Sequence, residues 1–168
     1  MNLPDPEALC TELGHRLNQL ISDKQLDNPM LVGIRSGGVW VAQRLQQQLS
    51  GTDEISTLNI SFYRDDFTRN GLHPNVEGSD LLESIEDRHI ILVDDVIMSG
   101  RTIRAAMNEL FDYGRPSSIS LVSLIDLGGR ELPIQPDVVA HRLQLPPTQR
   151  VKLVGPDPLK IEIREVKA

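Results

Sequence analysis

The chain has 168 residues but only one cysteine, Cys10, and six aromatic side chains. A single cysteine excludes a disulfide within the chain, and this scarcity is typical of proteins from reducing compartments. With so few aromatic residues, the core has to be built mainly from Leu, Ile and Val. The sequence has no apolar run near the roughly 18 residues that span a membrane. Its start, MNLPDPEALC, lacks the basic and apolar regions of a secretory signal. We therefore expect a cytoplasmic protein with one domain.

Basic residues are also in short supply. Lys and Arg number 17 against 24 Asp and Glu, which gives a net charge of −7, and the sequence has no basic run. An acidic chain does not attract polyanions as a whole, so nucleic-acid binding would require a local basic patch. A solvated acidic surface is the simpler interpretation of this composition.

The sequence does contain a regular alternation of strand and helix patterns. Asp5 followed by Pro6 is typical of a helix N-cap and first turn, and predicts an amphipathic helix to about Lys24. The other elements predicted up to residue 125 are strands at 30–34, 55–62, 90–94 and 119–125 and helices at 39–49 and 100–113. This order predicts an α/β fold with a doubly wound, mainly parallel sheet and ligands at the carboxyl ends of its strands.

Two segments depart from the alternation. Residues 63–78 are polar and contain Asn70-Gly71, a pair typical of hairpin turns. A flexible hairpin loop of this length is most often an ordinary surface loop, although active-site lids have the same character. The proline-rich remainder is predicted to carry short strands at 138–141, 151–154 and 159–166, which we expect to form a small hood over about residues 133–166.

The most informative segment is HIILVDDVIMSGRT, residues 89–102. Four apolar residues lead into Asp94 and Asp95, as in a strand buried on both faces of a parallel sheet. A turn of small residues then opens a helix, whose first backbone N–H groups have no partner within the helix and can bind an anion. The segment therefore places two carboxylates beside a phosphate site. Such a site suits a ligand with a phosphate at one end and hydroxyl groups or a metal ion nearby.

Two further segments follow predicted strands, namely Arg35-Ser36-Gly37-Gly38 and Arg64-Asp65-Asp66. Each feature has a plain alternative interpretation when it is taken alone. The glycines could form only a tight turn, and Arg64 could be an ordinary surface arginine. Paired aspartates also end strands in phosphoacceptor receiver domains or simply cap helices. Taken together and in this order, the three segments are much more specific.

Their order and spacing resemble a known family. Residues 90–102 are similar to the signature with which type I phosphoribosyltransferases bind phosphoribosyl pyrophosphate. Further segments resemble the bifunctional pyrimidine operon regulatory protein/uracil phosphoribosyltransferase family: SFYRDDFT, SGRTIRAAMNEL, GRPSSISLVSLID, RELPI and PTQRVKLV. The likeness covers roughly residues 7–155. It implies a glycosyltransferase of the pentosyltransferase class that converts uracil and phosphoribosyl pyrophosphate into UMP and pyrophosphate. The resemblance also implies Mg²⁺, bound mainly through the substrate, so we assign no protein ligands to the metal.

The resemblance implies a role for each matching residue. Asp94 and Asp95 would bind the ribose hydroxyls and stabilise charge at the sugar, and Arg64 would close over the pyrophosphate. The other residues implied in substrate binding are Ser36 and Gly37 at the pyrophosphate, Val96, Ile97, Met98, Ser99, Gly100, Arg101 and Thr102 around the 5′-phosphate, Arg130 near the nucleotide, and Val151 in the hood, where backbone groups would read uracil.

The chain departs from the family pattern at three positions. Ser99 replaces the usual threonine and keeps its hydroxyl group, so we expect little effect. Gly37 and Leu127 stand where many relatives have arginine, which removes two positive charges. Arg130 is retained, either as a compensating contact to the nucleotide or as a structural residue.

The regulatory activity implied by the resemblance is binding of mRNA by a homodimer or a dimer of dimers. The basic candidates for this surface are His15, Arg16, Arg142, Arg150 and Lys152. So few residues in a chain of net charge −7 predict weak RNA binding. Two alternatives to uracil phosphoribosyltransfer stay open. One is a nucleotide-sensing regulator with little turnover, and the other is a phosphoribosyltransferase for another base.

Overall fold

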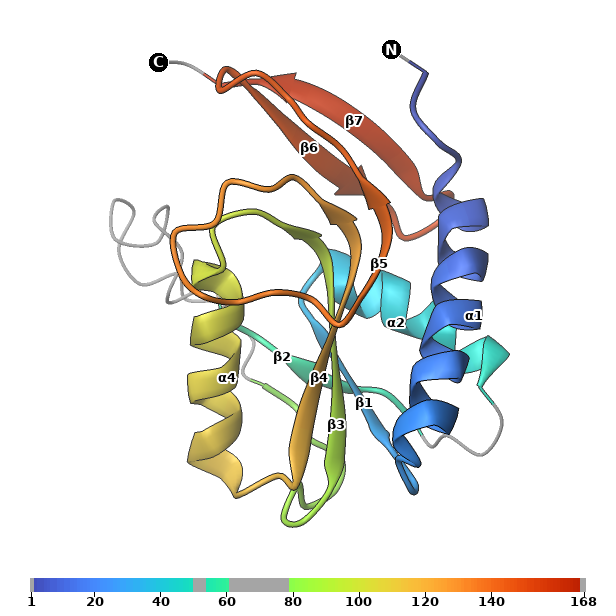
Figure 1. Cartoon of the computed structure of the whole chain (residues 1–168), viewed down its shortest axis with the longest axis vertical. Helices are drawn as coiled ribbons and strands as arrows, with labels where there is room; N and C mark the ends of the chain where they lie inside the picture. The colour runs from blue at the N-terminus through green and yellow to red at the C-terminus, as the bar shows by residue number, and fades with distance from the viewer. Residues whose placement is uncertain (1, 50–53, 61–78, 167–168) are drawn as a thin grey trace.

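The computed structural model describes residues 2–49, 54–60 and 79–166. Its main element is a parallel sheet of five strands in the order β2-β1-β3-β4-β5, and β6 and β7 form a separate antiparallel pair (Figure 1). The strands are β1 Met30–Ile34, β2 Ser56–Leu58, β3 His89–Ile97, β4 Ser118–Asp126, β5 Val138–Arg142, β6 Gln149–Val154 and β7 Lys160–Glu165, and the helices are α1 Pro6–Lys24, α2 Gly37–Gln48 and α4 Arg101–Tyr113.

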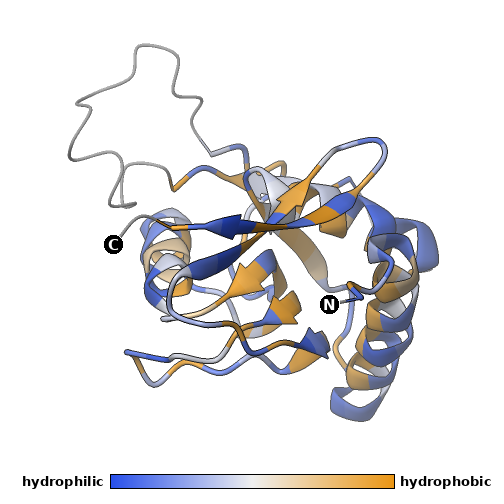
Figure 2. Ribbon diagram, turned by 90° about the horizontal axis from the view of Figure 1, so that it is seen from above, coloured by the Kyte–Doolittle hydropathy of each residue, from blue (hydrophilic) through white to orange (hydrophobic). Residues whose placement is uncertain are grey.

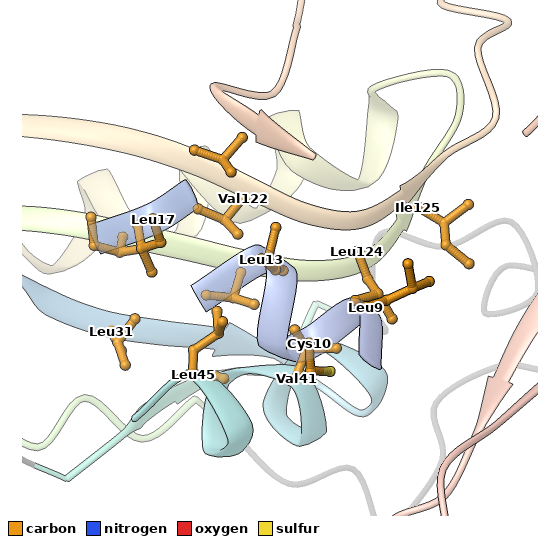
Figure 3. Close-up of a cluster of buried hydrophobic side chains, with 14 of the residues drawn as sticks. Leu9, Cys10, Leu13, Leu17, Leu31, Val41, Leu45, Val122, Leu124 and Ile125 are labelled. Carbon is orange, nitrogen blue, oxygen red and sulfur yellow. The ribbon is translucent and has the colours of Figure 1, made fainter. Parts of the chain in front are cut away.

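Helices cover both faces of the parallel sheet. Helices α1 and α2 lie on one face and α4 lies on the other (Figure 1). Neighbouring strand residues divide between two core clusters, so that Leu31 packs with α1 and α2 whereas Val32 packs with α4. Figure 3 shows the first of these clusters, in which side chains of α1 and α2 meet those of the sheet. Burial on both faces explains why the strands read as continuous apolar runs in the sequence.

The first helix forms as its sequence predicts. The Asp5 carboxylate accepts a hydrogen bond from the Ala8 N–H, Pro6 occupies the first turn, and Gln25 ends the helix in a left-handed conformation. Viewed from above, the outer face of α1 is hydrophilic and its apolar residues face the sheet (Figure 2). No helix in residues 2–49, 54–60 and 79–166 is long and apolar enough to cross a membrane.

The strand at Val138–Arg142 differs from the expectation. We predicted it as part of the hood, but it pairs in parallel with β4 and forms the edge of the main sheet. Val138 and Val139 are buried there. The preceding Asp137 carboxylate accepts a hydrogen bond of 2.7 Å from the Leu121 N–H of β4. The hood strands are therefore β6 and β7, which lie above the carboxyl ends of the sheet (Figure 1).

The strand predicted at 55–62 is shorter in the structure, where β2 ends at Leu58. The Asn59 N–H donates to the Ser79 hydroxyl at 3.0 Å instead of to a neighbouring strand. Residues 61–78, which include all of the hairpin loop predicted at 63–78, lie outside the described residues.

A side-chain network attaches the hood to the helices. The Arg44 guanidinium of α2 donates to the Pro156 carbonyl at 2.6 Å and to the Glu7 carboxylate of α1 at 3.1 Å. Beside it, the Trp40 ring lies so close to Gly155 that a methyl group there would be 3.1 Å from the ring. The hairpin is therefore fixed to the face of the domain that carries α1 and α2.

Cys10 lies inside this helical layer, only 1% exposed. Burial, aided by the negative charge of Glu7, raises the pKa of its thiol from 9.0 to about 12. Its thiolate fraction at pH 8 is then about a thousandfold below that of an ordinary thiol. We expect Ellman's reagent to leave Cys10 unmodified in the folded protein and to titrate it fully in 6 M guanidinium chloride. Rapid modification of the folded protein would contradict this placement.

Candidate active site

The chain reverses direction across the sheet between β1 and β3. From β1 it passes to β2 at one edge, and it then returns to β3 on the opposite side of β1. In doubly wound sheets, ligands bind outside the carboxyl ends of the strands at such a switch point. The turn after β1 and the turn after β3 meet at this place, because the two strands are hydrogen-bonded neighbours.

The turn after β3 leads into α4 and leaves its N-terminus open. Gly100 is the N-cap residue with φ 94°, and in the described part of the chain no side chain caps the helix. The Ser99 hydroxyl accepts from the Arg101 N–H at 3.1 Å, and the Ser99 carbonyl accepts from Glu131 N–H at 2.9 Å. The turn is thus fixed, and although Ser99 accepts from the Arg101 N–H, the following N–H groups of the first helical turn are left for an anion.

Gly100 is the residue on which this turn depends. A φ of 94° is strained for any side chain, and a methyl group there would lie 3.4 Å from the Ile134 Cβ. We expect Gly100→Ala to lower the free energy of unfolding by about 1–3 kcal/mol and to weaken binding of a phosphorylated ligand. Gly128→Ala is a matched control, because φ is 71° but no atom lies within 4 Å. Equal losses in urea unfolding of the two variants would contradict the conclusion that a side chain is more strained at Gly100, with φ 94°, than at Gly128, with φ 71°.

The turn after β1 opens a second helix in the same manner. Ser36 is the N-cap of α2 without a side-chain hydrogen bond, and no acidic residue lies in the first turn. The peptide bond between Arg35 and Ser36 is cis. A methyl group at Gly38 would overlap the Val93 carbonyl, so the missing side chain allows α2 to approach the backbone of β3. Two helix N-termini therefore flank the switch point, which gives a ligand two positions for phosphate groups.

Asp94 and Asp95 lie within β3, which continues to Ile97 instead of ending at residue 94 as predicted. The Asp94 carboxylate accepts from the Asp95 N–H at 2.9 Å, and Asp95 accepts from the Val96 N–H at 2.8 Å. Asp94 is 3% exposed, whereas Asp95 is partly exposed and lies against Gly37 at the start of α2. Of the two predicted acids, Asp95 is therefore the more exposed one at the switch point, the place where doubly wound sheets have their ligand crevice, and Asp94 is buried.

The Arg130 side chain connects the loop that follows β4 to the ends of β3 and β4 by hydrogen bonds. Its guanidinium binds both carboxylate oxygens of Asp126, at 3.0 and 2.7 Å. The same side chain donates to the carbonyls of Met98 and Ile134, at 2.8 and 2.7 Å, and to the Gln135 amide oxygen at 3.1 Å. All five N–H donors of an arginine are thus engaged within the protein. The structure favours the structural role of Arg130 over the compensating contact to a nucleotide.

Asp126 is charged at neutral pH although its side chain is buried. Burial alone would raise the pKa of its carboxyl group, but hydrogen bonds from Arg130 and Gly128 and the charges of Arg130 and Arg142 outweigh burial. The net effect lowers the pKa below its ordinary value of 3.8. The sequence left open whether Arg130 contacts the nucleotide or is structural, and it did not reveal the partners that determine this arrangement.

The remaining predicted substrate residues differ in how exposed their side chains are. Val96 and Ile97 end β3, and Met98 projects into solvent while its carbonyl accepts from Arg130. Val151 is buried in the core cluster under the hood, so only its backbone remains for contact with a base. Leu127 packs against the same cluster. Arg64 lies outside the described residues.

The candidate RNA-binding residues do not form one free cationic surface in the described part of the chain. Arg16 donates to the Val139 carbonyl at 2.6 Å and to Glu12 at 2.9 Å. Arg150 donates to the carbonyls of Pro147 and Gln149. His15, Lys152 and Arg142 are exposed. In the same residues, no group of three His, Cys, Asp or Glu side chains is arranged to bind a metal ion.

The family model of the phosphoribosyl transferase domain matches residues 2–154. The bifunctional protein PyrR of Pseudomonas savastanoi pv. phaseolicola is 53% identical over 99% of this chain and 98% of its own length. The protein of that name from Nitrosococcus oceani is also 53% identical, with the same coverage. The chain belongs to the PyrR family of type I phosphoribosyltransferases. The resemblance inferred from the motifs is thereby confirmed, and as a PyrR-family member the chain is an enzyme of the pentosyltransferase class.

Solved structures agree with the fold of this PyrR-family chain. A hypoxanthine phosphoribosyltransferase from Staphylococcus aureus superposes with a TM-score of 0.62 and 23% identity, covering 83% of this chain and 73% of its own. The Trypanosoma cruzi enzyme gives a TM-score of 0.64, also at 23% identity, covering 83% and 74%. At this identity the likeness shows the fold alone, and it confirms the predicted α/β architecture with a doubly wound sheet.

Proposed function

We propose that this protein transfers the 5-phosphoribosyl group from phosphoribosyl pyrophosphate to uracil, which gives UMP and pyrophosphate. The observation that supports the proposal is the pair of open helix N-termini on either side of Asp95. The N-terminus of α4 suits the 5′-phosphate, and that of α2 suits the pyrophosphate. A donor that carries phosphate groups at both ends of a ribose suits this arrangement of two anion sites beside a carboxylate.

The chemistry proposed for Asp95 follows from its charge and position. In the transfer, the bond from the ribose anomeric carbon to pyrophosphate breaks and pyrophosphate leaves with the electron pair. A bond to a uracil nitrogen forms, and that nitrogen loses its proton to water. The anomeric carbon becomes electron-poor as the leaving group departs, so a carboxylate fixed nearby stabilises the transition state. The hydrogen bond from Val96 holds one Asp95 oxygen in place, and the other is directed toward the α2 turn.

The residues present also fit Mg²⁺. Carboxylate and phosphate oxygens are the ligands that Mg²⁺ prefers, and it is commonly held by one or two carboxylates together with substrate phosphates. Asp95 is partly exposed and could contribute a carboxylate oxygen to the ion, and the donor would supply most of the other oxygens. When bound, the ion would neutralise charge on the departing pyrophosphate.

The decisive assay incubates the protein with labelled uracil, phosphoribosyl pyrophosphate and Mg²⁺. We expect UMP to form in amounts that depend on all three components. Tight binding of the donor without UMP would instead indicate the nucleotide-sensing regulator. Product formation only with orotate, hypoxanthine or adenine would indicate a phosphoribosyltransferase for another base.

A role in regulating pyrimidine biosynthesis genes through mRNA rests on family membership alone. Arg16 already donates to the Val139 carbonyl and to Glu12, and Arg150 donates to two backbone carbonyls. We therefore expect weak RNA binding, with an affinity that decreases as the salt concentration rises. Each phosphate contact contributes about 0.7–0.9 to the slope of log affinity against log salt. A gel shift in the nanomolar range at 0.15 M salt would overturn this expectation.

A further inference from the structure

The first turn of α2 contacts β3 at two adjacent glycines, and the two contacts differ in kind. A methyl group at Gly38 would meet backbone atoms, namely the Val93 carbonyl oxygen and the Asp94 Cα at 3.1 Å. The three atoms nearest to a methyl group at Gly37 all belong to the Asp95 side chain: the methyl group would overlap Oδ2 and lie 2.6 Å from Cγ and 2.9 Å from Cβ. The space beside Gly37 is therefore filled by the Asp95 carboxylate along its whole length.

This contact determines where the Asp95 carboxylate lies. Its Oδ1 accepts from the Val96 N–H at 2.8 Å, and its Oδ2 rests against the α2 turn. The positive end of the α2 dipole is at that turn, which favours a negative charge there. Any side chain at position 37 would enter the volume of the carboxylate and force it into another rotamer.

We propose that Gly37 is a positioning residue for Asp95. Because position 37 has no side chain, the Asp95 carboxylate can lie against the α2 turn, between the carboxyl ends of β1 and β3. This role rests on the proposed function, because Asp95 acts on the ribose and the α2 turn binds the pyrophosphate. The contact between Gly37 and Asp95 therefore joins the carboxylate that acts on the ribose to the turn that binds the pyrophosphate. Gly37 is thus more than a lost arginine: its lack of a side chain is what this arrangement of Asp95 requires.

A double-mutant cycle between Gly37→Ala and Asp95→Ala tests the coupling. In the native background, Gly37→Ala overpacks the contact and lowers Tm by about 3 °C or more. The same change lowers kcat about 10- to 100-fold, since small displacements of a catalytic group have effects of this size. In the Asp95→Ala background, most of the overlap is gone, so Gly37→Ala should lower Tm by less than about 1 °C and change kcat less than about twofold.

Gly38→Ala is the matched control, because its methyl group would overlap backbone whatever side chain stands at position 95. It should lower Tm equally in both backgrounds. Equal effects of Gly37→Ala in both backgrounds, in Tm or in kcat, would overturn the proposal. If the native protein forms no UMP, the proposed function fails. The Tm cycle then still decides whether Gly37 positions Asp95.

Discussion

Asp95→Asn should reduce the rate of UMP formation by about 100-fold or more, with little change in stability. The amide has the shape of the carboxylate and still accepts the hydrogen bond from Val96, but it lacks the negative charge. Removing one preorganised electrostatic group from an active site typically lowers kcat by 10²–10³. The measurement is kcat with saturating phosphoribosyl pyrophosphate, uracil and Mg²⁺, together with Tm.

Asp112→Asn is the control for this variant. It removes the same charge from the exposed face of α4, away from the crevice. Its kcat should stay within about twofold of the native value, since surface changes of this kind have small effects. An Asp95→Asn variant that keeps a third of the native kcat would exclude the role given to this carboxylate.

Arg130→Met should lower the free energy of unfolding by about 3 kcal/mol or more, because removal of one partner leaves a buried charge uncompensated. The side chains of Arg130 and Asp126 are only 13% and 7% exposed. Methionine fills a similar volume, yet it leaves both Asp126 oxygens and two backbone carbonyls without this donor. Urea unfolding at pH 7 measures the change.

Arg164→Met provides the comparison. It removes an arginine from the ion pair with Glu162 on β7, where both side chains are about half exposed. Exposed pairs contribute little, so the loss should stay below about 1 kcal/mol. Similar losses in the two variants would show that the bonds of Arg130 do not fix the loop after β4.

The effect of Arg130→Met should also depend on pH. The folded pKa of Asp126 is below 3.8, and the unfolded value is about 3.9. A lowered folded pKa stabilises the native protein above the unfolded pKa, and this stabilisation is lost as pH falls through the folded pKa. In the variant, burial acts without its counterion and favours the protonated acid. The stability difference between native protein and variant should therefore be largest at neutral pH. It should decrease as the pH falls into the acid range, first as Asp126 of the variant becomes protonated and then as Asp126 of the native protein does.

The sequence was sufficient to predict the local elements. Asp5 and Pro6 act on their own helix, and Ser99-Gly100 acts on the turn that it forms, so both could be recognised from neighbouring residues. Pairing across the sheet was harder. The strand at Val138–Arg142 was predicted as part of the hood, because its neighbours in sequence do not show which strand it pairs with. Its place in the main sheet is evident from its pairing with β4 and from the Asp137 hydrogen bond to that strand.

The details of the site depended on contacts between distant segments. β3 continues through Asp94 and Asp95 because it stays paired with β4 as far as Ile97 and Asp126, and the two carboxylates accept from the backbone N–H groups that follow them. A list of apolar residues does not reveal such bonds. The position of Asp95 against Gly37 joins residues 58 positions apart in the sequence. The motif therefore indicated the candidate site residues, whereas the division into a buried Asp94 and a partly exposed Asp95 required the fold.

The most direct test of the account is a crystal structure of the protein with phosphoribosyl pyrophosphate and Mg²⁺. We predict the 5′-phosphate at the N-terminus of α4, within hydrogen-bond distance of the backbone at Arg101 and Thr102. The ribose should face Asp95, and the pyrophosphate should lie at the Ser36–Gly37 turn. Density for the donor at any other place, with the crevice between β1 and β3 empty, would contradict the account.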